Sequence, residues 1–184
     1  FAGWEFKGYF DMFEFPWLSY NASSPSDGYD WFTQLDYRVN REVSMYWRIK
    51  GQSKDDPLNL DEPEISLMLP EKILKARYRL AIEPTNYLRL KTQVEFVDYQ
   101  SNEDEEREQG WLLSQDIIWQ MKKVPLRFVT RFAVFRTDSY ASRIYTYEYD
   151  VLYAFSIPAY YYHGKRFYLL AKYSPGDNID IWLR

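Results

Sequence analysis

The amino-acid sequence predicts an all-β protein, an antiparallel up-and-down transmembrane β-barrel of about ten strands, complete or part of a larger barrel. Three observations predict this fold class. Apolar and polar residues alternate with a period of two, short and long connections alternate, and aromatic residues gather near the ends of the expected strands. We expect residues 1–184 to form a single β-barrel domain or a barrel fragment.

Composition narrows the class of protein further. Aromatic residues make up 20% of the chain, with 18 Tyr, 12 Phe and 7 Trp, which argues against disorder. The net charge of -4 gives no global reason to expect nucleic acid, and the absence of cysteine excludes thiol catalysis and zinc–thiolate sites. No run of about 18 apolar residues is present, so a membrane role needs strands. We expect a mature or partial chain whose targeting segment is not in this sequence.

The period of two defines the strands. In residues 87–96 (YLRLKTQVEF), one face collects Leu, Val and Phe and the other collects Arg, Lys, Gln and Glu. The same division recurs in residues 31–38, 43–50 and 73–82, where a helical period would mix the two faces. Further strands are expected at residues 3–15, 111–122, 126–136, 143–157, 165–174 and 179–184.

The connections alternate in length. Four stretches read as tight turns rich in Pro, Asn or Gly, namely VNRE, EPTN, KKVP and SPGDN. Longer polar connections lie between them, as in transmembrane barrels with short turns on one side and long loops on the other. A strand over residues 143–157 reverses this order near the C-terminus. A bend or bulge near Glu148 to Asp150, or a segment that does not fully cross, would explain the reversal.

In an outer-membrane barrel the apolar face of each strand meets lipid and the polar face points into the lumen. A basic stripe in the lumen could guide a polyanion, and the alternative is that these charges pair across a narrow barrel and fill it. The predicted lipid-facing residues are Leu74, Leu80, Leu88, Leu90, Val94 and Phe96. The predicted lumen-facing charged residues are Lys75, Arg77, Arg79, Arg89, Lys91, Glu95, Arg127, Arg131, Glu148 and Asp150.

Aromatic residues near strand ends suggest the two interfacial girdles of a membrane barrel. The alternative is an aromatic-rich core of a soluble protein, because a soluble sandwich shows the same alternation. The predicted interfacial aromatic residues are Trp17, Tyr20, Trp111, Tyr160 and Tyr161.

Motifs for catalysis and metal binding are weak, so we predict no enzyme, no cofactor and no metal site. The single histidine, His163, lies in YYYHGK, where a solvated or interfacial side chain is favoured over the base of an interfacial hydrolase. The acidic run of residues 103–108 lacks the interleaved glycines and spacing of a calcium loop, and a solvated external loop is favoured.

Residues 135–184 contain the strings TDSYASRIY, DVLYAFSIPAYY and DIWLR. These strings resemble the closing segment of a Bacteroidota family called helix-hairpin-helix domain-containing proteins. The resemblance implies an outer-membrane β-barrel in the C-terminal portion of a competence-like protein. No helix-hairpin-helix segment is visible here, so nucleic-acid binding is not supported by this segment. Family members continue past the WLR string into further strand, which implies an incomplete barrel.

Together these expectations describe a protein of the bacterial outer membrane. We predict a structural or transport component, related to the passage or handling of a polyanion. Its partners would be membrane lipid and further strands, supplied by the same chain or by a larger outer-membrane assembly, because open sheet edges cannot face hydrocarbon. The alternative is a soluble lipocalin-like or β-sandwich module that binds a small hydrophobic ligand.

Overall fold

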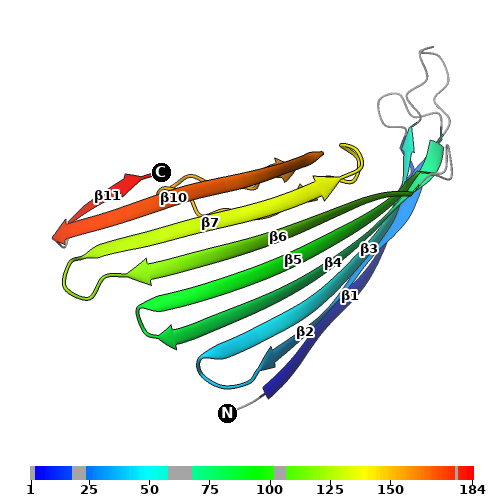
Figure 1. Cartoon of the computed structure of the whole chain (residues 1–184). Coiled ribbons are helices and arrows are strands. Elements are labelled where there is room, and N and C mark those ends of the chain that lie inside the picture. Colours follow the sequence, from blue (N-terminus) through cyan, green and yellow to red (C-terminus); the bar gives the residue numbers. More distant parts are fainter. Residues whose placement is uncertain (1–2, 18–23, 58–67, 102–106, 177) are drawn as a thin grey trace.

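A computed structural model describes residues 3–17, 24–57, 68–101, 107–176 and 178–184. Within these ranges the chain is all-β, and a 9-stranded antiparallel sheet runs in the order β1-β2-β3-β4-β5-β6-β7-β10-β11 (Figure 1). Its strands are β1 (Gly3–Phe15), β2 (Ser26–Arg38), β3 (Val43–Pro57), β4 (Met68–Thr85), β5 (Leu88–Ser101), β6 (Arg107–Gln120), β7 (Leu126–Thr137), β10 (His163–Gly176) and β11 (Ile179–Leu183). The all-β, up-and-down antiparallel part of the predicted fold class is confirmed.

The prediction of a strand over residues 143–157 is wrong. Two short strands, β8 (Ile144–Tyr145) and β9 (Ala159–Tyr160), pair with each other, and a single bridge joins Glu148 to Ser156. Residues 138–162, which we call the strap, therefore form a long connection from β7 to β10. With the strap as a connection, the connections at one end of the sheet have five residues or fewer and those at the other end have five or more (Figure 1).

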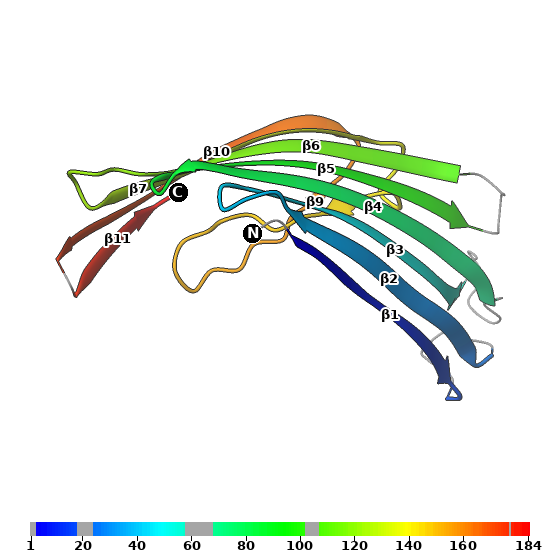
Figure 2. The same ribbon diagram turned by 90° about the horizontal axis from the view of Figure 1, so that it is seen from below.

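The sheet is arched, and the strap lies beneath its concave face (Figure 2). Along β5 the burial alternates residue by residue, because successive side chains point to opposite faces. Lys91, Gln93 and Glu95 are buried on the concave face, whereas Val94 and Phe96 are exposed on the convex face. The polar face of the strand is thus the covered one.

Two small apolar clusters hold the strap against the sheet. In the first, Ile144 and Tyr160 of the strap are buried with sheet residues that include Leu112 and Ala133. In the second, Tyr149 and Val151 of the strap pack on Ile118, Val129 and Leu170 of the sheet. Burial of these side chains supplies the hydrophobic part of the docking free energy.

Both lateral edges of the sheet are open. Within the described part of the chain, β1 pairs with β2 and β11 pairs with β10, and neither has a second strand neighbour. Each edge therefore presents a row of backbone N–H and C=O groups without a strand partner. Among the described residues there is no helix with the length and apolar character needed to cross a lipid bilayer.

Candidate functional site

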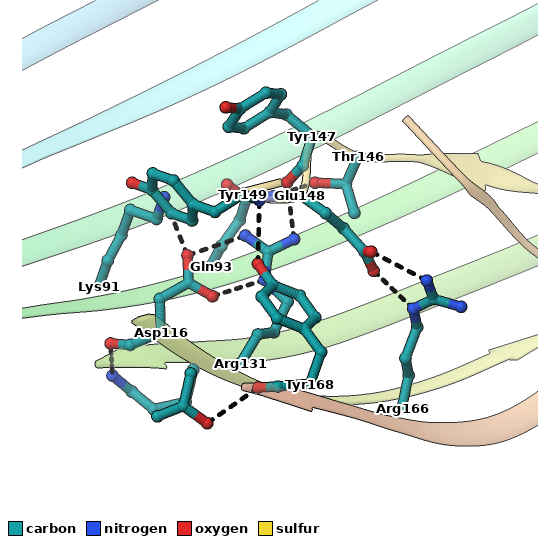
Figure 3. Close-up of polar contacts among 12 residues, drawn as sticks. Lys91, Gln93, Asp116, Arg131, Thr146, Tyr147, Glu148, Tyr149, Arg166 and Tyr168 are labelled. Carbon is teal, nitrogen blue, oxygen red and sulfur yellow. Dashed lines mark hydrogen bonds and ion pairs between the residues drawn. The ribbon is translucent and has the colours of Figure 1, made fainter. Parts of the chain in front are cut away.

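The concave face collects the polar side chains of the molecule, and its C-terminal half is buried under the strap. Figure 3 shows the contacts between strap and sheet in this half, which we call the polar network. Its buried polar and charged members are Lys91, Gln93, Glu95, Asp116, Arg131, Thr146 and Glu148.

Asp116 lies at the centre of the polar network, between two cations. It sits opposite Arg131 in the β6–β7 register and opposite Lys91 in the β5–β6 register. Arg131 donates from Nε to Oδ1 at 2.5 Å and from Nη2 to Oδ2 at 2.8 Å, and Lys91 Nζ lies 2.9 Å from Oδ2. The Arg131 and Asp116 side chains are each 1% exposed. Such a buried, bidentate pair stabilises the fold while it is intact, because removing one partner leaves an uncompensated charge.

The same sheet residues bind the strap. Arg131 donates from Nη1 to the Tyr147 carbonyl at 2.7 Å, and Gln93 donates from Nε2 to Thr146 Oγ1 at 2.9 Å (Figure 3). Lys91 Nζ donates to the Tyr149 hydroxyl at 3.1 Å and lies 4.7 Å from the centre of its ring. The buried charges of the sheet thus hold the strap in one register as well as pairing with one another.

Glu148 is the strap's own charged anchor, and its side chain is 0% exposed. Arg166 of β10 contacts it through Nε at 2.6 Å, and Arg184 and the Tyr160 hydroxyl bond to it as well. Burial alone would raise the pKa of the Glu148 carboxyl. The hydrogen bonds from Arg166 and Tyr160, with the charges of Arg166 and Arg184, outweigh burial and hold that pKa below its usual range.

A glycine admits the strap backbone to the sheet. A Cβ built on Gly110 would lie 2.6 Å from the Ser142 carbonyl oxygen, closer than van der Waals contact allows. Since Gly110 pairs with Thr137 at the end of the β6–β7 ladder, this close approach lies where the strap leaves the sheet. The sequence therefore needs glycine at this position for the strap to turn onto the concave face.

The N-terminal half of the concave face has a different electrostatic pattern. Arg48 sits directly opposite Arg77, and Lys50 sits directly opposite Lys75, in the β3–β4 register. Arg79 lies two residues beyond Arg77 and so on the same face. Between Ser44 and Gln52 on β3, and between Ile73 and Ala81 on β4, the charged residues of this face are therefore all cations.

The convex face is an apolar band across the nine-stranded sheet. Within it, Trp4 stacks on Tyr37 at 4.0 Å between ring centroids, and Trp119 stacks on Phe128 at 6.0 Å. The band comprises Trp4, Phe6, Phe10 and Met12; Tyr29, Trp31, Leu35 and Tyr37; Val43, Met45, Trp47 and Ile49; Leu74, Tyr78, Leu80 and Ile82; Leu88, Leu90, Val94 and Phe96; Trp111, Leu113, Ile117 and Trp119; Phe128, Phe132 and Val134; Phe167, Leu169 and Tyr173; and Ile179, Ile181 and Leu183.

The band crosses the strands obliquely. On β10 the apolar band ends at a charged residue, Lys165. If the paired residues are followed from strand to strand across the sheet, Lys165 of β10 lies level with Phe6 of β1. On β1, however, the band continues past Phe6 and ends at Glu14, which is the next charged residue on this face and lies eight positions further along the strand. At about 3.3 Å per residue and about 4.8 Å between strands, this shift corresponds to a slope of roughly 35–40°.

The structure places the predicted site residues on two faces. The six predicted lipid-facing residues lie on the convex face, and the predicted lumen-facing charges of β4, β5 and β7 lie on the concave face. Arg89 pairs with Glu83 at 2.7 Å near the turn, and Arg127 is exposed at the start of β7. Glu148 and Asp150 lie in the strap, where both contact Arg184.

The predicted interfacial aromatic residues do not all lie in exposed positions. Trp17 is exposed after β1, Trp111 lies on the convex face, and Tyr161 is exposed in the strap against Tyr140. Tyr160 was predicted wrongly, since it is buried beneath the concave face and donates to Glu148. Tyr161 and Tyr162, which follow it, are exposed, so the aromatic run alone gave no sign of the difference. Tyr20 lies outside the described residues.

The weaker motifs gain no support from their surroundings. His163 begins β10, is exposed, and pairs with Arg136 in the register. Residues 103–106 of the acidic run lie outside the described ranges, and Glu108 accepts a hydrogen bond from Ser139. Across the described residues, no three His, Cys, Asp or Glu side chains form a group suited to a metal ion.

Sequence reasoning missed Arg166, Tyr168 and Arg184 as members of the polar network. Tyr168 accepts a hydrogen bond from the Tyr149 backbone at 3.1 Å, and both arginines hold Glu148. Alternation puts Arg166 and Tyr168 on the polar face of β10, and this signal was present in the sequence. Their partners in the strap were hidden because the strap itself was assigned as a strand.

Comparison with known proteins does not assign the chain to a family. No family model matches the chain, and no curated protein or solved structure is significantly similar to it. The geometry described above therefore carries the functional argument.

Proposed function

We propose that this chain forms the wall of an outer-membrane β-barrel, as a structural or transport component whose concave face handles a polyanion. The observation that carries the proposal is the inverted arrangement of the sheet. Charged side chains such as Asp116 and Arg131 are buried on the strap-covered concave face, while large apolar side chains cover the convex face. Lipid is the solvent that suits such a convex face, whereas water would favour the opposite distribution.

The dimensions of the apolar band support the proposal. From Leu88 to Phe96 the band extends about 26 Å along β5, at about 3.3 Å per residue. Strands in membrane barrels are tilted by about 35–45° from the barrel axis. A horizontal slab of hydrocarbon would therefore cross such strands obliquely, with the slope that the boundary from Glu14 to Lys165 shows. Trp111 and Trp119 lie at opposite ends of the band on β6, as interfacial girdles would.

The open edges at β1 and β11 indicate which partners the sheet needs in a membrane. In hydrocarbon the unpaired backbone groups of β1 and β11 would each cost several kcal/mol, so further strands must cover both edges. These strands come from the same protein or from another subunit, and membrane lipid covers the convex face. The bacterial outer membrane is the compartment that this architecture fits, and the resemblance of residues 135–184 to a Bacteroidota family points to the same place.

A charge placed in the apolar band tests the proposal. Leu113 is 45% exposed on the convex face, between Val94 and Val134 of the neighbouring strands. Leu113→Lys should destabilise a lipid-embedded sheet by about 2–4 kcal/mol. The free energy of unfolding is measured by urea titration of the full protein in detergent micelles or lipid.

The matched control is Gln109→Lys, on the same strand and face but beyond the apolar band, where a lysine should cost about 0–1 kcal/mol. The parent protein should require detergent for extraction and should migrate differently on gels before and after boiling. A protein that stays monodisperse in plain buffer, and in which Leu113→Lys changes stability by less than about 0.5 kcal/mol, would favour the soluble ligand-binding module instead.

A further inference from the structure

We propose that the concave surface of β3 and β4, together with the adjoining cleft between the strap and β4–β5, is a binding site for a linear polyphosphate-type polyanion. The site is the basic cluster, which we define as Arg48, Lys50, Lys75, Arg77 and Arg79 of the sheet with Arg143 of the strap. Its members on β3 and β4 face each other in the register, and Arg143 and Lys75 line the same cleft. The assignment deepens the proposed function and rests on it for the accessibility of the concave face.

The basic cluster opposes the stability of the sheet. Like charges directly opposite each other on neighbouring strands are destabilising, and the cluster contains two such pairs, Arg48 with Arg77 and Lys50 with Lys75. Packing of the sheet alone does not explain why four cations occupy these facing positions. An anionic ligand would remove the repulsion, so the cluster has a physical reason once a ligand is bound.

Most of the cluster has no carboxylate partner among the described residues. Lys50 contacts Asp30 at 2.7 Å, and Arg77 contacts Glu95 at 2.7 Å. The remaining partners are neutral: Arg48 donates to Gln34, Arg79 donates to Gln93, and Arg143 donates to the Tyr145 hydroxyl and the Tyr140 carbonyl.

Two hydrogen-bond donors of the basic cluster have no acceptor among the described residues. Lys75 makes no hydrogen bond or ion pair with any described residue. The charges within its electrostatic reach are those of Lys50, Arg77 and Arg143 and the carboxylate of Glu95, which Arg77 contacts at 2.7 Å. The Nε of Arg77 is buried without an acceptor. The cluster thus presents more N–H donors than the protein itself satisfies, which is the arrangement a multiply charged anion requires.

The cleft offers room for a charged group. It has a volume of about 300 Å³ and is lined by Lys75 from the sheet and Arg143 from the strap, with Tyr99, Tyr140 and Tyr145 around them. Glu71 also lines the cleft, and its carboxylate accepts a hydrogen bond from the Tyr99 hydroxyl. Guanidinium groups bind phosphate oxygens in a bidentate manner. Cations on one face of a strand repeat about every 6.7 Å, and neighbouring strands are about 4.8 Å apart, so the cluster suits a chain of several phosphate groups.

The test uses inorganic tripolyphosphate as the probe, with the full protein in detergent and isothermal titration as the measurement. We expect salt-sensitive binding that Lys75→Gln and Arg143→Gln each weaken at least about fivefold. Each substitution should also lower the slope of log affinity against log salt by about one, because one fewer counterion is released. Inorganic phosphate, with one group, should bind far more weakly than tripolyphosphate.

The matched control is Lys172→Gln, a cation of the same face that Asp180 neutralises at 2.8 Å, and its affinity should stay within twofold of the parent. Undetectable binding of tripolyphosphate, or binding that Lys75→Gln and Arg143→Gln leave unchanged, would overturn the site. Equal binding of phosphate and tripolyphosphate would overturn the polyanion. Gel migration before and after boiling is recorded for the same samples, so loss of the site and failure of the membrane proposal give separate results.

Discussion

The two halves of the concave face differ in how their charged side chains are paired. Under the strap, each strongly buried charge has an opposite partner, as Asp116 has in Arg131 and Lys91. Towards β3 and β4, at the margin of the strap, cations face each other across the register, and Lys75 makes no hydrogen bond or ion pair with any described residue. The strap thus covers the part of the face whose charges are paired with one another, and the proposed anion site lies where cations of neighbouring strands face each other.

The largest expected difference between the halves comes from removing one carboxylate from each. Asp116→Leu leaves the buried cations Arg131 and Lys91 uncompensated, and it should lower the free energy of unfolding by about 3–5 kcal/mol. Asp30→Leu in the uncovered half breaks the more exposed pair with Lys50 and should cost less than about 1 kcal/mol. Urea titration in micelles measures both. Equal losses would show that the two halves do not differ in the way described.

Acid should release the strap and leave the sheet. Because folding lowers the pKa of Glu148, its contribution is complete above the usual value of 4.5 and is lost as the pH falls through the lowered value. Hydrogen exchange, corrected for the intrinsic effect of pH, should show the amides of Glu148 and Tyr149 losing protection in that acid range. The ladder amides of β5 and β6 should keep theirs. Glu148→Gln should show weaker strap protection at neutral pH and little further loss in acid.

The smallest expected effect has opposite signs in the two halves. Lys75→Gln removes a repelling charge and should raise the free energy of unfolding by a few tenths of a kcal/mol in the absence of ligand. Lys91→Gln, on the neighbouring strand and the same face, removes a charged contact to Asp116 and should lower it by about 1–3 kcal/mol. Destabilisation by Lys75→Gln would show that Lys75 has a structural role and would remove an argument for the basic cluster.

The sequence predicted the sheet and its two faces because alternation with a period of two is a local property. The strands around 31–38, 43–50, 73–82 and 87–96 were predicted correctly, and the structure extends them by up to seven residues at one or both ends. The strap was missed because residues 143–157 alternate like a strand while lying against the sheet as an extended connection. The reversed order of short and long connections was the signal of that error.

The site was predictable in its residue types and not in its partnerships. Arg131 and Lys91 were placed on the polar face, yet their shared partner Asp116 depends on the register of β6 with both of its neighbours, β5 and β7. Tyr160 and Tyr161 look alike in sequence, and the contacts of the strap decide that one is buried and the other exposed. Long-range contacts of this kind carry no local period.

The partners of Glu148 impose an order on assembly. Arg166 and Arg184 follow the strap in the chain, so a folding intermediate that has paired its strands as far as β7 can make the strap's contacts to β5–β7 but not those that hold Glu148. In such an intermediate Glu148, which is buried in the complete fold, would lack both of its arginine partners. The final hairpin, β10 to β11, therefore completes the burial of the strap's one fully buried carboxylate, and the last strand pairing also fixes the last contacts of the strap.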